Sequence, residues 1–362
     1  MSGLFDAVLS RRSLAKASIA AGAVASLPFS LHSAQAQDEI VVTMVTDTAG
    51  LGDQNFNDLA NKGGTRAADE LGIEWKVNES VDQASYIPNL TAGAEGGQLT
   101  VGVGFLLTDA MAEVSAQFPD KFFQLIDSVA ETGNVQSVLF KEDQIGFLCG
   151  VVSGQMTKTN KLGIVGGQRI PPVIRYEVGF VAGVKSVNEA AEVIINYTDT
   201  FGDQNLGKDT AAAQYNQGCD IVFPIAGFTG TGVYLAASEL NKLGEIWVVG
   251  VDTAQDHLAP GYELCVGNKG VDFAVFEACK QVVDGNFKGG ILTYDLKSGG
   301  IGLTLYPERT PVEVGDLARG YEKAIIDGTI VPPTTDEELT AFVVPERPEP
   351  IPATPEASPE SA

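Results

Sequence analysis

Histidine and cysteine are scarce in this sequence, and their scarcity limits the chemistry that the protein can perform. Of its 362 residues, two are histidine and four are cysteine. His257 is the only histidine after the first 36 residues, and no nucleophile pattern surrounds it. The cysteines show no CxxC spacing and no neighbouring histidine, which argues against a metal site. We therefore expect no metal, no cofactor and no histidine-assisted catalysis. Free thiols and disulfides both remain possible for Cys149, Cys219, Cys265 and Cys279.

Basic side chains are also scarce in comparison with acidic ones. The chain has 23 lysines and arginines against 47 aspartates and glutamates, a formal net charge of −24 at pH 7. This balance argues against nucleic acid or an anionic membrane surface as a partner. It does not identify a ligand, because an acidic surface also serves solubility.

Residues 1–36 have the pattern of an export signal of the twin-arginine type. Arg11 and Arg12 precede an apolar stretch, Ala17 to Leu31, which is too short and too rich in Ala and Gly to remain in a membrane. Residues 34–36 supply a small-x-small cleavage site, and the first cysteine is Cys149. We therefore expect a soluble periplasmic protein without a lipid anchor.

From residue 37 to about residue 334, strand patterns alternate with helix patterns. The expected strands are 40–46, 74–78, 100–103, 122–126, 135–140, 162–165, 192–197, 220–225, 246–251, 264–266 and 291–295. The expected helices are 56–71, 88–97, 109–118, 144–156, 173–190, 205–217, 230–243 and 271–285. This alternation predicts parallel sheets with helices on both faces, and about 300 residues are more than one such core usually holds. We therefore expect two α/β lobes.

A short internal repeat, called the internal echo below, is consistent with two lobes. Thr46-Asp47-Thr48 followed by Gly52-Asp53-Gln54-Asn55 recurs as Thr198-Asp199-Thr200 followed by Gly202-Asp203-Gln204-Asn205. Each copy ends an expected strand and begins an expected helix. Beyond residue 331 the composition shifts to Pro, Glu, Thr, Ser and Ala, and residues 332–362 are predicted to be a disordered acidic tail.

Carboxylates follow several of the expected strands. Asp47 comes after residues 40–46, Asp127 after residues 122–126, and Asp252 after residues 246–251. In open α/β sheets, ligands bind outside the carboxyl ends of the strands. Carboxylates accept hydrogen bonds from hydroxyl groups, and phenylalanine rings offer flat faces for a heterocycle. This combination favours a ligand with a flat ring and a polyol.

The chain resembles the basic membrane protein family, the substrate-binding components of ABC transporters for purine nucleosides. The match covers roughly residues 37–329. It rests on the segments VTDTAGLGDQNFND, VGVGFLLTDAMAEVSAQFPDKFFQLID, KEDQIGFLCGVVSG, KLGIVGGQRIPPVIRYEVGFVAGVKSVN, GFTGTGVYLAASE, WVVGVDTAQD and LKSGGIGL.

The resemblance implies a type I periplasmic binding protein: two doubly wound parallel-sheet lobes joined by a three-crossing hinge. The crossings are expected near Lys141, Asp252 and Gly289. Residues 37–140 and 252–288 would form lobe 1, and residues 141–251 and 289–331 would form lobe 2.

The resemblance also implies a ligand site in which a purine lies between two aromatic rings, Phe56 and Phe180. Carboxylates would hold the ribose and the base. The full set of expected ligand-binding residues is Asp47, Asn55, Phe56, Asn57, Asp127, Phe180, Gly227, Asp252 and Lys269. Two departures affect the ligand: Phe228 stands where the family usually has glycine, and Thr253-Ala254 lacks a usual carboxylate.

The implied function is a monomeric periplasmic binding protein that delivers a purine nucleoside to an ABC permease. A riboflavin-like ligand remains an alternative, since some relatives bind this flat-ring polyol. Two other classes also remain open. A periplasmic nucleoside hydrolase would use the carboxylates, and a sensor subunit would dock a receptor.

Overall fold

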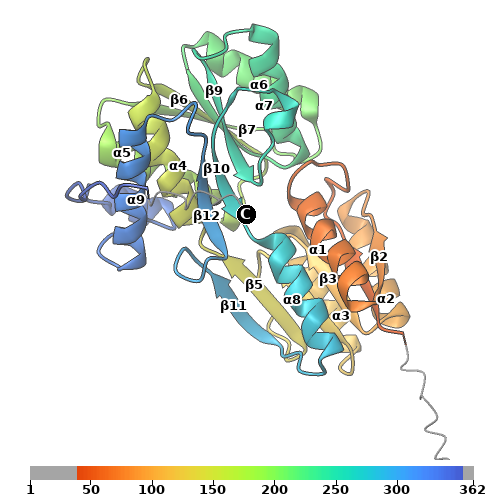
Figure 1. Cartoon of the computed structure of the whole chain (residues 1–362). Helices are drawn as coiled ribbons and strands as arrows, with labels where there is room; N and C mark the ends of the chain where they lie inside the picture. The colour runs from red at the N-terminus through yellow and green to blue at the C-terminus, as the bar shows by residue number, and fades with distance from the viewer. Residues whose placement is uncertain (1–38, 354–362) are drawn as a thin grey trace, which may run out of the picture. The chain divides into compact units, whose positions relative to one another are not determined.

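The computed structural model describes residues 39–353 and contains two six-stranded sheets (Figure 1). The first sheet has the order β11-β5-β4-β3-β1-β2, and all its pairings are parallel. Its strands are β1 (Val41–Val45), β2 (Glu74–Asn78), β3 (Leu99–Val103), β4 (Phe122–Ile126), β5 (Val135–Phe140) and β11 (Gly290–Tyr294). Its helices are α1 (Phe56–Leu71), α2 (Tyr86–Gly96), α3 (Thr108–Gln117) and α8 (Val271–Val283). We call this unit lobe 1.

The second sheet has the order β12-β10-β9-β8-β6-β7, with β12 antiparallel to β10. Its strands are β6 (Lys161–Gly166), β7 (Glu192–Tyr197), β8 (Ile221–Ile225), β9 (Trp247–Asp252), β10 (Glu263–Lys269) and β12 (Ile301–Leu305). It is accompanied by α4 (Glu142–Met156), α5 (Pro171–Val187), α6 (Gln204–Asn216), α7 (Phe228–Leu240), α9 (Val312–Ile326) and α10 (Asp336–Ala341). We call this unit lobe 2. The two-lobed α/β fold predicted from the sequence is confirmed.

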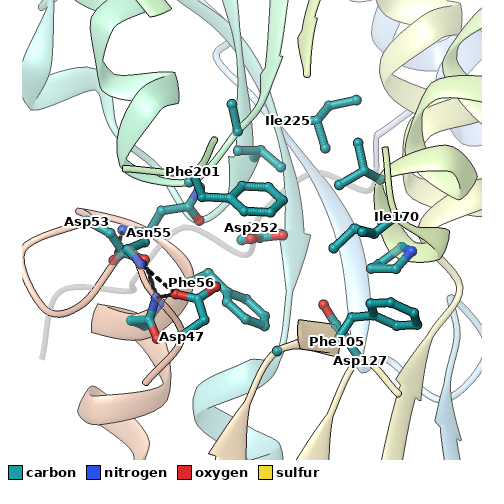
Figure 2. Close-up of a pocket in the computed structure, with 18 of the residues that line it drawn as sticks. Asp47, Asp53, Asn55, Phe56, Phe105, Asp127, Ile170, Phe201, Ile225 and Asp252 are labelled. Carbon is teal, nitrogen blue, oxygen red and sulfur yellow. Dashed lines mark hydrogen bonds between the residues drawn. The ribbon is translucent and has the colours of Figure 1, made fainter. Parts of the chain in front are cut away.

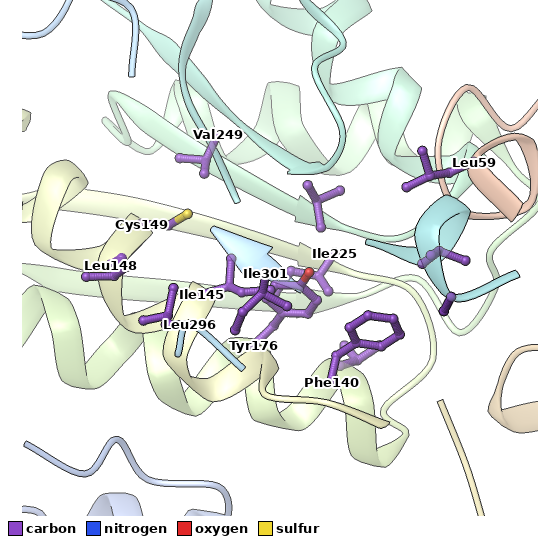
Figure 3. Packing of buried hydrophobic residues seen from close by; sticks show 14 of the residues in the cluster. Leu59, Phe140, Ile145, Leu148, Cys149, Tyr176, Ile225, Val249, Leu296 and Ile301 are labelled. Atoms are coloured by element: carbon purple, nitrogen blue, oxygen red, sulfur yellow. The ribbon is translucent and has the colours of Figure 1, made fainter. Parts of the chain in front are cut away.

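Alternating side chains along the central strands explain why helices cover both faces of each sheet. In lobe 1, Met44 packs with residues of α1 and α8, whereas Val45 packs with residues of α2 and α3. In lobe 2, Ile164 lies in the core with α4, α5 and α9, and Val165 lies in the core with α6 and α7. Figure 3 shows Ile145 and Cys149 of α4, which belong to the same core as Ile164.

The chain passes between the sheets after Phe140, after Lys269 and after Tyr294. The expected crossings near Asp252 and Gly289 are therefore displaced. β10 pairs with β9, which keeps residues 252–269 in lobe 2, and β11 pairs with β5, which places residues 290–294 in lobe 1. The sequence pattern identified strands at these places but not their partners, because pairing between distant strands leaves no local signal.

The expectation of disorder from residue 332 is wrong for residues 332–353. α10 forms there, and Leu339 and Phe342 pack against the hydrophobic core of lobe 2. The sequence pattern also failed to predict the strand β12 and the helix α9. The predicted export signal and residues 354–362 lie outside the described residues. None of the helices between residues 39 and 353 is long and apolar enough to span a membrane.

Candidate functional site

A pocket lies where strands of both sheets end (Figure 2). Lobe 1 contributes Asp47, Ala49, Asp53, Asn55, Phe56, Asn57, Gly104, Phe105, Leu106 and Asp127. Ile170, Pro172, Val173, Tyr176, Phe201, Ile225, Ala226, Gly227, Val251, Asp252 and Lys269 come from lobe 2. Eight of the nine expected ligand-binding residues line this pocket, and Phe180 does not.

Asp53 organises the loop that joins β1 to α1. Its buried carboxylate accepts hydrogen bonds from the backbone N–H groups of Asn55, Asn57 and Asp58, at 3.0, 2.8 and 3.0 Å. The side-chain amide of Asn57 donates to Asp53 (3.1 Å) and to Asp47 Oδ1 (2.8 Å). These contacts direct Asn57 and Asp47 toward the pocket.

Burial raises the pKa of both carboxylates in this loop. The pKa of Asp53 is raised to about 6, even though four hydrogen bonds act in the opposite direction. The pKa of Asp47 is also raised by burial, against hydrogen bonds from Asn57 and Ala49. A ligand that donates hydrogen bonds to Asp47 would favour its charged form.

Several strand ends turn into the pocket through left-handed backbone. Asp127 follows β4 with φ 68°, and Asp252 ends β9 with φ 61°. Gly104 and Gly227, at the ends of β3 and β8, have φ values of 112° and 54°. A non-glycine residue in this conformation is strained by about 1–3 kcal/mol, and such strain clusters at functional sites.

Lys269 forms the centre of a buried charged cluster. Its Nζ lies 2.6 Å from Asp127 Oδ2 and 2.9 Å from Glu142 Oε1. Arg175 Nε lies 2.6 Å from the other oxygen of Glu142. Asp127 belongs to lobe 1 and Lys269 ends β10 in lobe 2, so the 2.6 Å ion pair joins the two lobes.

The pKa values in this cluster reflect burial opposed by pairing. Burial raises the pKa of Asp127 to about 7, and Lys269 limits the rise. Burial would also raise the pKa of Glu142, but Lys269 and Arg175 together lower it. For Lys269, burial acts to lower the pKa, and the neighbouring carboxylates of Asp127, Glu142 and Asp252 raise it above the usual value.

Aromatic rings from both lobes face the pocket. Phe56 and Phe105 come from lobe 1, and Tyr176 and Phe201 come from lobe 2. Lys269 Nζ lies 5.2 Å from the centroid of the Phe56 ring, and the Tyr176 hydroxyl donates to Asp252 Oδ1 at 2.7 Å. Figure 2 shows Phe201 and Phe56 entering from different lobes. Flat rings of this kind can bind an aromatic heterocycle.

The expectation that Phe180 stacks on the ligand is contradicted by its position. Its side chain is 0% exposed and packs against Phe223, with ring centroids 5.2 Å apart. Tyr176 lies on the same helix, one turn nearer its N-terminus, and does reach the pocket. Residues i and i+4 share a helix face, so the sequence pattern could not decide which of the two meets a ligand.

Phe201 and Asp53 are further pocket residues that the sequence reasoning missed. Both lie within the internal echo, Phe201 after Thr198-Asp199-Thr200 and Asp53 before Gln54-Asn55, so the echo was the signal that could have found them. Phe228, one of the two departures expected to affect the ligand, begins α7 and is not among the residues that line the pocket.

The pocket offers unused hydrogen-bond acceptors. Asn55 Oδ1, Asn57 Oδ1 and Asp127 Oδ1 are buried and have no partner within residues 39–353. A buried acceptor left unpaired costs free energy, about 1–3 kcal/mol. A ligand carrying hydroxyl or N–H donors would satisfy these atoms.

Residues 39–353 contain no group of three or more His, Cys, Asp or Glu side chains that could hold a metal ion. All four cysteines are buried and free.

Residues 40–335 match the family described as ABC transporter substrate-binding protein PnrA-like. The chain belongs to this family. The members are substrate-binding proteins rather than enzymes, which confirms the expectation of a binding protein.

Individual relatives agree with this assignment. The ABC transporter nucleoside-binding protein BmpA of Lactococcus lactis is 34% identical, with 83% of this chain and 91% of that protein covered. The CD4+ T-cell-stimulating antigen of Listeria monocytogenes is 35% identical, with 82% and 88% covered. Among solved structures, an ABC transporter solute-binding protein of Aeropyrum pernix superposes with a TM-score of 0.77 at 30% identity, over 83% of this chain and 98% of that one.

The chain is therefore a solute-binding component of an ABC transporter, and the pocket between the strand ends is its candidate ligand site. A component of this kind acts together with a membrane permease.

Proposed function

We propose that this protein binds a purine nucleoside in the pocket between its lobes and delivers it to the permease of an ABC importer. The observation that carries the proposal is the pairing of aromatic rings with unused acceptors. Phe56 and Phe201 offer flat faces for the base, while Asn57 and Asp127 present buried oxygens without partners among the described residues. The ribose hydroxyls and the exocyclic donors of a purine match these acceptors.

The similarity to BmpA of Lactococcus lactis, which is named a nucleoside-binding protein, supports the same ligand class. Stacking between two rings contributes on the order of 1 kcal/mol beyond the area that is buried. Each acceptor that gains a donor removes a desolvation cost of about 1–3 kcal/mol. A ligand that has both a flat base and hydroxyl groups therefore gains more than free ribose or a free base.

A panel of ligands tests this proposal. The purified protein is screened by thermal shift and then by titration calorimetry with inosine, adenosine, uridine, riboflavin, ribose and glucose. We expect inosine or adenosine to raise the melting temperature by mass action and to bind more tightly than ribose alone. Binding of riboflavin but not of either nucleoside would replace the nucleoside with a larger flat-ring polyol, and binding of glucose alone would remove the stacking argument.

Absence of turnover separates a binding protein from a nucleoside hydrolase. After prolonged incubation with the protein, inosine and adenosine should be recovered unchanged by chromatography. Release of free base, if abolished by Asp127→Ala, would contradict the proposal.

We also infer that residues 1–36 direct the protein to the periplasm by the twin-arginine route. Arg11 and Arg12 carry this inference. Substituting both with lysine should leave the precursor in the cytoplasm, as fractionation with an antibody would show. Normal export of that variant would point to a different secretion route.

A further inference from the structure

The family match ends at residue 335, and the chain continues with a segment packed against lobe 2. We define residues 336–353 as the C-terminal extension. It begins with α10, whose first turn is capped by Thr335: the side chain of this residue accepts a hydrogen bond from the N–H of Glu338. The extension is therefore an ordered element of this chain beyond the matched region.

The C-terminal part of the extension, from Phe342 to Ile351, is anchored on α4 and α9. The Phe342 ring meets the edge of Phe147, with centroids 6.2 Å apart and an interplanar angle of 71°. The N–H of Ile351 donates to the carbonyl of Asp316 at 2.8 Å, and Arg319 Nε donates to the carbonyl of Ile351 at 2.8 Å. These contacts hold the extension against lobe 2 over most of its length.

The first residue of the extension, Asp336, contacts Arg169. Both carboxylate oxygens of Asp336 lie within hydrogen-bond distance of Arg169 Nη2, at 2.7 and 2.9 Å. The same nitrogen lies 3.3 Å from Glu177, and the guanidinium carbon lies 5.9 Å from the Tyr197 ring centroid. Arg169 is therefore held by α5, β7 and α10 together.

Arg169 directly precedes one wall of the ligand pocket. Ile170, Pro172 and Val173 line the pocket, and Tyr176 of the same helix donates to Asp252. Figure 2 labels Ile170 on the side of the pocket away from Phe56. Pro171 and Pro172 restrict the backbone where α5 begins. A shift of Arg169 would therefore move Ile170 and the first turn of α5 with it.

We propose that the C-terminal extension holds this wall in its ligand-binding position through the contact of Asp336 with Arg169. Asp336 is then a positioning residue that acts on the pocket without touching the ligand. The part of the inference that concerns affinity rests on the proposed nucleoside ligand.

The size of the effect follows from exposure. The side chains of Arg169 and Asp336 are 42% and 51% exposed, so their ion pair alone has a modest effect. Asp336→Asn should weaken binding by about two- to five-fold, which is what a half-exposed pair supports. Removing residues 336–362 should weaken binding further, because the anchors at Phe342 and Ile351 are lost as well.

The experiment compares two truncations and three point variants. A chain ending at Thr335 is compared with a chain ending at Ala353, which retains the whole extension. Asp336→Asn is compared with Glu337→Gln, which removes one charge from the neighbouring exposed position, and with Asp336→Glu, which should restore binding. Each protein is examined by hydrogen exchange over residues 167–174 without ligand and by calorimetry with inosine and adenosine.

We expect faster exchange of residues 167–174 and weaker nucleoside binding in the shorter truncation and in Asp336→Asn, but not in their controls. Lower thermal stability with unchanged exchange and unchanged affinity would show that the extension only adds stability, and the inference would be wrong. If the wild-type protein binds neither nucleoside, the proposed function fails. The exchange measurement would then still decide whether the extension positions the wall.

Discussion

At the scale of single residues, the buried cluster around Lys269 makes this side chain necessary for stability. Asp127 and Glu142 are both buried against it, at 2.6 and 2.9 Å. Removing one partner from a buried ion pair leaves an uncompensated charge, and the cost is about 3–5 kcal/mol. Lys269→Met should lower the free energy of unfolding by about this amount, as measured by chemical denaturation.

The same variant should show a defined pH dependence. Burial already raises the pKa of Asp127 to about 7, and loss of Lys269 removes the interaction that limits this rise. An acid whose pKa is higher in the folded state stabilises the protein below its unfolded pKa and loses that contribution as the pH rises. The deficit of Lys269→Met should therefore be larger at pH 8 than at pH 5. Lys62→Met, which removes a lysine 69% exposed, is the control and should change stability by less than about 1 kcal/mol. If Lys269→Met loses the same unfolding free energy at pH 5 and at pH 8, the raised pKa of Asp127 is contradicted.

Phe180 and Phe201 should separate stability from binding. Phe180→Ala removes a fully buried ring and should cost about 3–5 kcal/mol of unfolding free energy. Phe201→Ala removes a ring that lines the pocket, so it should cost less stability and weaken nucleoside binding by roughly 1–3 kcal/mol. Denaturation without ligand and calorimetry with inosine measure the two effects. The assignment of the second ring fails if Phe180→Ala, and not Phe201→Ala, reduces affinity in folded protein.

These two residues also show what could be predicted from the sequence. Asp47, Asp127 and Asp252 were predicted as pocket residues because carboxylates after strands of an α/β sheet meet at one edge, and all three line the pocket. The second aromatic residue could not be predicted, because Tyr176 and Phe180 share one face of α5, and only the depth of the helix in the lobe distinguishes them.

At the scale of elements, α4 and α5 pack closely through glycine. A Cβ atom at Gly150 would lie 2.2 Å from the carbonyl oxygen of Phe180, which real contacts do not allow. Gly150→Ala should therefore push the helices apart and lower the unfolding free energy by about 1–3 kcal/mol. A Cβ atom at Gly96, at the end of α2, would meet nothing within 4 Å, so Gly96→Ala should be neutral or slightly stabilising. Thermal or chemical denaturation compares the two, and equal stability would show that the helices separate without cost.

Elements were predicted well where their own residues determine them. α1 was predicted at residues 56–71 and β5 at residues 135–140, and both occupy these ranges. β12 was missed because Ile301–Leu305 contains Gly302 and is stabilised by pairing with β10, about 35 residues earlier in the chain. α10 was missed because Pro and Glu dominate the composition of the tail, whereas the few apolar side chains that pack, such as Phe342, give a weak pattern.

At the scale of the whole molecule, contacts between the lobes connect residues that are far apart in the chain. Asp127 pairs with Lys269, and the side-chain amide of Gln255 in lobe 2 donates to the carbonyl of Gln54 in lobe 1 at 3.1 Å. The sequence pattern predicted two lobes, and the family resemblance implied three crossings. Neither predicted the places of two crossings or these pairs, since both depend on tertiary pairing rather than on local pattern.

Three crossings and a pocket lined from both lobes imply that ligand binding and lobe closure are coupled. The crossings follow Phe140, Lys269 and Tyr294, and hinged lobes of this kind can move as rigid bodies. A ligand shifts the balance between open and closed forms only by its differential affinity for them. A nucleoside that contacts Phe56 in lobe 1 and Phe201 in lobe 2 would have such a difference, because separating the lobes would take one of the two rings away from it.

We therefore expect saturating inosine or adenosine, whichever binds, to reduce the radius of gyration measured by solution X-ray scattering. Phe201→Ala, saturated with the same nucleoside, should close less completely, because its lobe 2 contact is weakened while the lobe 1 contacts at Asp47 and Phe56 remain. Glu337→Gln, which alters a residue outside the pocket, should close as the wild type does. Identical scattering of the wild-type protein with and without a tightly bound nucleoside would exclude closure of the lobes over the ligand, because rigid-body movement about the crossings would change the distances between the two lobes.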